Sequence, residues 1–169
     1  MKKNLKRGFT LIELLIVITV ISILGAVAFV AIDPATRINQ AQDSERWSAA
    51  NALMDAFLNS TVDNDGTYPA GVSANGTVHM IATTSGACTV SGCTDTVTTC
   101  TDFDDSVSDT DFDDLVNDGY IADLPVDPDG NTSYGSAQGG TGYTLSVNTT
   151  GIVTVTACGA ETDTIEVAR

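Results

Sequence analysis

The sequence predicts an α+β protein, in which a long N-terminal helix is followed by a small C-terminal antiparallel sheet. Three observations support this class: an apolar run over residues 9–32, an amphipathic stretch to about residue 60, and alternating apolar residues near the C-terminus. The chain has 169 residues, which leaves room for one exported domain of ordinary size beyond the apolar run.

The apolar run is long enough to cross a membrane. A helix of 24 residues is about 36 Å long, and the hydrocarbon core of a bilayer is about 30 Å thick. Basic residues precede the run: Lys2, Lys3, Lys6 and Arg7. The positive-inside tendency therefore places the N-terminus in the cytoplasm and the remainder of the chain outside it.

The segment RGFTLIELLIVI, residues 7–18, resembles the class III signal of type IV prepilins and of type II secretion pseudopilins. Its G-F-T-L-I-E core matches that signature residue for residue, and a looser resemblance extends through DGTYP to about residue 69. In a secretory signal the cut follows the apolar core, whereas here the basic leader, residues 1–8, ends where the apolar run begins. In this family the apolar run stays in the product.

The resemblance implies a processing site, a set of partners and a fold. A prepilin peptidase would cut between Gly8 and Phe9 on the cytoplasmic side and N-methylate the new terminus at Phe9. Glu13 would help to recruit each subunit into a helical filament of identical or related pilins at an inner-membrane assembly platform. The implied fold is pilin-like: a long helix, bent partway, whose second half packs on the sheet.

Glu13 is the only charged residue in the apolar run. A charge deep in a bilayer costs about 2.5 kcal/mol or more, and less near a helix end. In one interpretation the carboxylate rests among lipid headgroups, favoured by the positive end of its own helix. In the other it pairs with the terminal amine of a neighbouring subunit once helices pack away from water. The two interpretations fit successive stages, in the bilayer and in the assembly.

A bend or break is predicted at Asp33-Pro34, because proline removes a helix hydrogen bond and restricts the residue before it. The helix then resumes as an amphipathic half over residues 33–61. Side chains at three- and four-residue steps predict a face packed into the core: Trp47, Ala50, Leu53, Met54, Phe57 and Leu58. The sequence DNDG at residues 63–66 ends this helix.

Residues 62–169 are predicted to form an exported, acidic, cysteine-containing globular region. Residues 77–84 favour a short strand, and residues 112–117 favour a small helix closed by Gly119. Three alternating segments near the C-terminus, 143–147, 152–157 and 165–167, predict an antiparallel meander.

Acidic residues dominate the exported part. Once the leader is removed, three arginines remain against 22 acidic residues, and residues 61–168 contain no Lys or Arg. Such a surface repels phosphate backbones, so no direct nucleic-acid binding is expected. The plainer interpretation is a solvated surface that keeps an exported protein soluble.

The cysteines predict two disulfides on the exported side. All four lie outside the apolar run: Cys88, Cys93, Cys100 and Cys158. Their spacing does not match the paired knuckles of structural zinc sites. Three connectivities remain open, and at least one bridge is expected to tie the connecting region to the sheet.

Two acidic segments are candidates for calcium. Asp127, Asp129 and Asn131 place oxygen ligands at alternating positions around a glycine. A second group crowds one segment: Asp102, Asp104, Asp105, Asp109, Asp111, Asp113, Asp114 and Asp118. Major pseudopilins are a family in which a C-terminal loop binds calcium, so the resemblance favours Ca²⁺ as a candidate cofactor. Neither segment fits the twelve-residue calcium loop, and the alternative is an exposed, mutually repelling acidic surface.

Catalysis is not expected. His79 is the only histidine, the leader holds all the lysines, and no nucleophile can be paired with a base. Together with the resemblance, this favours a structural subunit of a type IV pilus-like extracellular filament, polymerised through its N-terminal helix.

Two alternatives remain open. One is a pseudopilin of a type II secretion system, and the other, of a different class, is a membrane-anchored adhesin or calcium-binding module. The precursor is expected in the cytoplasmic (inner) membrane as a single-pass protein. The product is expected in a cell-surface or periplasmic filament.

Overall fold

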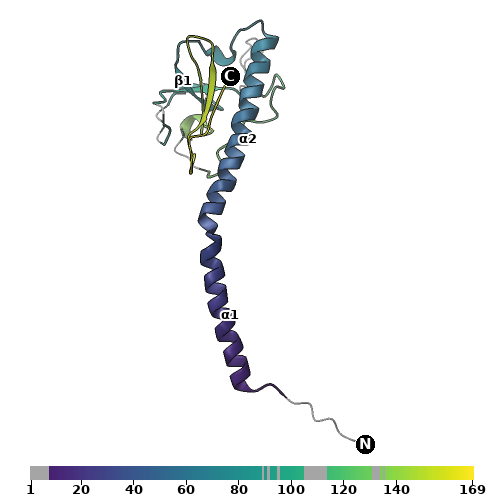
Figure 1. Ribbon diagram of the computed structural model, residues 1–169. Coiled ribbons are helices and arrows are strands. Elements are labelled where there is room, and N and C mark those ends of the chain that lie inside the picture. The colour runs from purple at the N-terminus through teal and green to yellow at the C-terminus, as the bar shows by residue number, and fades with distance from the viewer. Residues whose placement is uncertain are drawn as a thin grey trace, which may run out of the picture. The chain divides into compact units, whose positions relative to one another are not determined.

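The computed structural model describes residues 8–88, 90, 92–94, 96–104, 114–130, 134 and 136–169. The chain divides into two compact units, residues 1–38 and residues 39–169. The leader apart from Gly8 therefore lies outside the described residues. The α+β class is confirmed, with helices first and strands after them (Figure 1).

The first unit contains helix α1, Leu11–Ile32, and the start of helix α2, Pro34–Asp63. The predicted interruption is found at Asp33, which has a left-handed backbone (φ 42°, ψ 74°). Pro34 explains this position, because proline disfavours helical geometry in the preceding residue but is well suited to a first helical position. The Asp33 carboxylate accepts a hydrogen bond from the Thr36 hydroxyl at 2.6 Å and so supports the new helix start.

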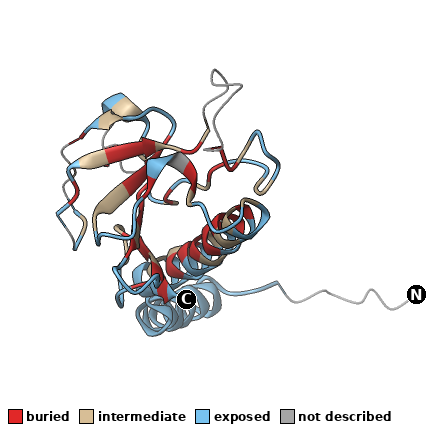
Figure 2. Cartoon of the chain, turned by 90° about the horizontal axis from the view of Figure 1, so that it is seen from above, coloured by how far each residue is buried: buried red, intermediate tan, exposed pale blue. Residues whose placement is uncertain are grey.

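In the second unit, α2 presents one face to the sheet, and Figure 2 shows its buried residues on that face. Ala50, Leu53, Met54 and Phe57 are all buried there, as predicted. Trp47 is a correction: its side chain is 44% exposed, so it lies outside the core. Two charged residues are buried on this face instead. Arg46 lies one turn before Ala50, and Asp43 lies two turns before it.

Six strands form one sheet in the order β2-β3-β1-β4-β5-β6. Their bounds are β1 Val78–Ala82, β2 Gly86–Ala87, β3 Thr99–Asp102, β4 Tyr143–Val147, β5 Val153–Ala157 and β6 Glu166–Ala168. The predicted meander is confirmed as β4, β5 and β6, and the predicted strand at 77–84 as β1. The sheet is mixed and not purely antiparallel, because β1 pairs with β3 in parallel. The connection between these two strands, sixteen residues from 83 to 98, is long enough for a parallel pairing.

The core lies between α2 and one face of the sheet (Figure 2). Leu145, Val155 and Val167 are aligned across β4, β5 and β6 and pack in one cluster with Phe57 of α2. A smaller cluster forms around β1 and β3 from Met80, Ala82, Cys88, Val97, Cys100 and Tyr134. Each face of the sheet therefore has its own apolar cluster.

Two short 3-10 helices, Pro69–Gly71 and Ser136–Gln138, complete the regular structure of the described residues. The small helix predicted at 112–117 is wrong over its described part. Residues 115–119 form a turn, in which the Tyr120 amide donates to the Leu115 carbonyl at 3.0 Å. Gly119, at φ 81°, ends the turn before a helix can propagate. Residues 112 and 113 lie outside the described part of the chain.

Candidate functional site

Helix α1 begins with a reciprocal cap between Thr10 and Glu13. The Glu13 amide donates to the Thr10 hydroxyl oxygen at 3.3 Å, while the Glu13 carboxylate accepts from the Thr10 amide at 2.8 Å. The Thr10 hydroxyl also donates to the same carboxylate oxygen, Oε2, at 2.9 Å. This capping box satisfies helix-end amides that otherwise lack partners, and the positive end of the helix favours the carboxylate.

The surface of α1 is apolar along its whole length. None of its residues, all of which the structure describes, is buried within the chain. Its polar side chains are satisfied internally: Thr19 donates to the Ile16 carbonyl at 2.8 Å and Ser22 donates to the Ile18 carbonyl at 2.7 Å. By its length and composition, this segment is long and apolar enough to cross a membrane. Such a surface requires lipid or other apolar helices around it.

Gly8 and Phe9 precede the helix cap and have no regular secondary structure. The Phe9 side chain is 85% exposed. Proteases cut most readily at exposed segments outside helices and strands, and Gly8 and Phe9 lie in such a segment. Cleavage and methylation at these residues remain predictions.

A comparison with protein-family models identifies this N-terminal segment. The chain carries a prokaryotic N-terminal methylation motif. The match covers residues 3–29, from the basic leader through most of α1, and it contains Gly8, Phe9 and Glu13. The methylation motif is the signal of type IV pilins and pseudopilins, so it supports a precursor of that kind and implies processing by a prepilin peptidase. Comparisons with characterised proteins and with solved structures found no match.

The methylation motif and the apolar helix together fit a membrane-anchored precursor. The carboxylate of Glu13 lies in the first turn of α1, where it caps the helix. The residue expected to drive assembly therefore also has a local role within its own chain. Any test of its function has to separate capping from charge.

Two disulfides join the four cysteines, as Cys88–Cys100 and Cys93–Cys158. Sequence separations are 12 residues for the first and 65 for the second. Cys100 lies in β3 and Cys158 directly follows β5, so both bridges tie the connecting region to the sheet, where at least one was expected. The structure thus selects one of the three connectivities that the sequence left open.

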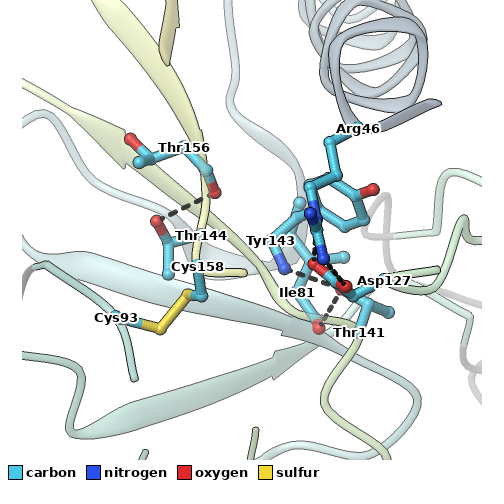
Figure 3. The surroundings of a disulfide bond; sticks show 9 residues. All are labelled: Arg46, Ile81, Cys93, Asp127, Thr141, Tyr143, Thr144, Thr156 and Cys158. Atoms are coloured by element: carbon cyan, nitrogen blue, oxygen red, sulfur yellow. Dashed lines mark hydrogen bonds and ion pairs between the residues drawn. A yellow bond between two sulfur atoms is a disulfide. The ribbon is translucent and has the colours of Figure 1, made fainter. Parts of the chain in front are cut away.

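A buried ionic cluster, formed by Arg46, Asp43 and Asp127, was missed by the sequence analysis. The fully buried Arg46 guanidinium donates from Nε to Asp127 Oδ2 at 2.9 Å and from Nη2 to Asp127 Oδ1 at 2.7 Å (Figure 3). Its Nη1 donates to Asp43 Oδ1 at 2.9 Å. The sequence did contain one signal for this cluster. Arg46 lies four residues before Ala50 and therefore on the apolar face of α2, where a buried charge needs a partner of opposite charge.

Asp43 connects the same cluster to a second loop. Its carboxylate accepts from the Glu161 amide at 3.1 Å and from the Thr162 amide at 3.0 Å, and it is also bonded to the Thr162 hydroxyl. Desolvation raises the pKa of Asp43, but the hydrogen bonds from Thr162, Glu161 and Arg46 outweigh it and hold this pKa below its ordinary value. Asp43 is therefore a charged anchor between α2 and the segment that precedes β6.

The acidic calcium candidates are only partly described. Asp127 is buried in the ionic cluster, Asp129 Oδ2 lies 3.7 Å from Arg46 Nη2, and Asn131 lies outside the described residues. In the second segment, Asp105, Asp109, Asp111 and Asp113 also lie outside them. Among the residues that are described, no group of three His, Cys, Asp or Glu is placed to hold a metal ion.

Described carboxylates in the second segment bind backbone amides. Asp102 Oδ1 accepts from the Asp104 amide at 2.9 Å, and Asp114 Oδ1 accepts from the Val116 and Asn117 amides at 2.9 and 3.0 Å. These contacts are the usual local bonds of aspartates in turns. Calcium binding by the second segment remains a prediction.

Proposed function

We propose that this chain is a structural, non-enzymatic subunit of a type IV pilus-like filament, cut between Gly8 and Phe9 and polymerised through α1. One observation carries the proposal: a helix that is apolar on every side bears a single carboxylate one turn from the expected new terminus, inside a methylation motif. An anchor that only holds a domain on a membrane could use this residue to cap its helix, but glutamine would cap it equally well, so the charge itself favours assembly.

Assembly would change the partner of Glu13. In the separate chain its carboxylate is held by Thr10. When α1 packs against copies of itself, water and headgroups are withdrawn from this carboxylate, and an unpaired charge there becomes costly. The terminal amine of Phe9 in a neighbouring subunit is the cation that could neutralise it. The filament would then select subunits that are already cut, because only these carry the amine.

Three variants separate the charge of Glu13 from its cap. Glu13→Gln keeps an acceptor for the Thr10 amide but removes the charge, since glutamine also closes capping boxes. Glu13→Ala removes both, and Thr10→Ala weakens the cap while keeping the charge. Each variant is expressed in the native host, and its cutting, its membrane insertion and its presence in sheared surface filaments are compared with the wild type.

We expect Glu13→Gln and Glu13→Ala to insert and to be cut, yet to be absent from filaments. Thr10→Ala should still assemble. Normal filament yield from Glu13→Gln would contradict charge pairing and assign Glu13 to capping alone. Wild-type protein that begins at methylated Phe9 but stays in the membrane fraction would favour a pseudopilin. An uncut chain would favour a membrane-anchored binding module.

Nucleic-acid contact is expected to be absent from the exported domain. If the filament takes up DNA, another subunit would make the contact, because residues 61–168 carry no Lys or Arg.

A further inference from the structure

The turn at residues 127–130 is fastened to α2 by a guanidinium group. The Gly130 amide donates to the Asp127 carbonyl at 3.1 Å, which closes the turn, and the Asp129 amide donates to Asp127 Oδ1 at 3.1 Å. The Arg46 side chain is 0% exposed and that of Asp127 is 1% exposed. Figure 3 shows Arg46 reaching from α2 to Asp127, with both carboxylate oxygens toward the guanidinium.

The surroundings of this ion pair are tightly packed. A Cβ atom at Gly159 would come within 2.5 Å of Asp127 Oδ2 and within 2.9 Å of Arg46 Nη2. A Cβ atom at Gly142 would come within 2.8 Å of the Asp127 Cβ atom. The two glycines let the backbone close over the ion pair.

This donor set does not fit a calcium ion. Calcium takes six to eight oxygen ligands at about 2.3–2.6 Å. Both oxygens of Asp127 already accept from Arg46, and one also accepts from the Asp129 amide. A divalent ion on this carboxylate would lie within a few ångströms of the guanidinium charge, and like charges at that distance repel strongly in a buried place.

We propose that Arg46 is the resident cation of the 127–130 turn, so that the turn closes on α2 without calcium. Arg46 neutralises Asp127 directly, shares its charge with Asp43 through Nη1, and lies 3.7 Å from Asp129. In this respect the chain departs from the calcium-binding C-terminal loop that its resemblance to major pseudopilins implies. Arg46 would have the same role in a pilin and in a membrane-anchored module.

Removal of the guanidinium group would leave the carboxylates around it close together without the cation that they share. In Arg46→Gln, Asp43 and Asp127 lose their charged partner, and Asp129 lies beside them. Buried carboxylates without a cation are strongly unfavourable, and an added divalent ion can then lower the energy of the folded state. The variant is therefore expected to gain a dependence on calcium that the wild type lacks.

The test measures thermal unfolding of the full processed chain in detergent micelles. Each protein is melted in EDTA, in a series of CaCl₂ concentrations, and in MgCl₂ at equal ionic strength. A ligand that binds only the folded state raises Tm progressively with its concentration. Arg169→Gln is the matched control, because it removes an arginine from an exposed pair with Asp55.

We expect the wild type, Arg169→Gln and Asp127→Asn to respond to CaCl₂ alike, because calcium bound elsewhere, as predicted for residues 102–118, acts on all three. Arg46→Gln should have a lower Tm in EDTA and should recover part of the loss with CaCl₂ but not with MgCl₂. A rise of the wild-type Tm with calcium that Asp127→Asn abolishes would overturn the proposal. So would a folded Arg46→Gln that calcium does not stabilise. If Arg46→Gln does not fold, the wild type and Asp127→Asn still decide the question.

Discussion

Single residues decide how α2 is joined to the rest of its unit. Arg46 and Asp43 occupy buried positions that an amphipathic pattern would give to apolar side chains. Breaking such a buried pair by removing one partner typically costs about 3–5 kcal/mol, because a charge is left without a partner. The cluster therefore fixes which loops lie against α2, at residues 127–130 and 161–162.

Gly159→Ala is expected to destabilise the folded domain by about 1–3 kcal/mol, the usual cost of overpacking. The added methyl group would clash with Asp127, Tyr134 and Arg46 at 2.5, 2.8 and 2.9 Å. Gly86→Ala is the matched control, since the nearest atom there is Gln138 Cγ at 3.7 Å. Urea unfolding of the full chain in micelles measures both changes, and equal stabilities for the two variants would show that the ion pair can yield to the methyl group.

At the scale of one element, α2 has two different halves. Its C-terminal half presents Leu53, Met54 and Phe57 to the sheet, whereas before Ala50 its only buried residues are Asp43 and Arg46 of the ionic cluster. Trp47 follows Arg46 by one residue, which rotates it by about 100° around the helix and away from the buried face. The spacing of apolar residues in the sequence does not show whether position 46 or position 47 lies on the buried face of α2.

Phe57→Ala should lower the unfolding free energy by about 3–5 kcal/mol, because it opens a cavity in the apolar cluster between α2 and the sheet. It also removes the stacking of Phe57 on Tyr68, whose ring centroids are 5.8 Å apart. Trp47→Ala should cost about 1 kcal/mol or less, since much of the ring already contacts solvent. Chemical unfolding of both variants tests the assignment. A larger loss at Trp47 than at Phe57 would contradict the placement of the core.

In the whole molecule, the two units depend on different interactions. The apolar helix α1 has no core of its own and depends on a membrane or on other helices. The second unit has a packed core, an ionic cluster and two disulfides. Its stability can therefore be measured separately from filament assembly, which separates folding defects from assembly defects.

The two disulfides should differ in their contribution to that stability. In the chain-entropy model, the Cys93–Cys158 bridge, with a separation of 65 residues, contributes about 4 kcal/mol, and the Cys88–Cys100 bridge, with 12, contributes about 3 kcal/mol. Unfolding of Cys93→Ser/Cys158→Ser and of Cys88→Ser/Cys100→Ser, each with the other bridge intact, gives both values. The reverse order would mean that packing in the smaller cluster matters more than loop length.

Features that depend on local pattern could be predicted from the sequence. The methylation motif could be identified from its residue-for-residue resemblance to a family signature. The apolar helix, the break at Asp33-Pro34 and the strands β1, β4, β5 and β6 follow from composition and periodicity over short segments. These signals persist because membrane insertion, proline geometry and strand alternation act on neighbouring residues.

Pairings between residues distant in sequence follow from the packing of the folded chain and could not be predicted from local pattern. The parallel pairing of β1 with β3, the disulfide connectivity and the contact of Arg46 with Asp127 join positions 12 to 81 residues apart. Many acidic residues were available to a single buried arginine, and nothing in local pattern distinguishes Asp127 from the others. Packing of α2 on the sheet selected it, because that packing brings one aspartate to the guanidinium and withdraws both from water.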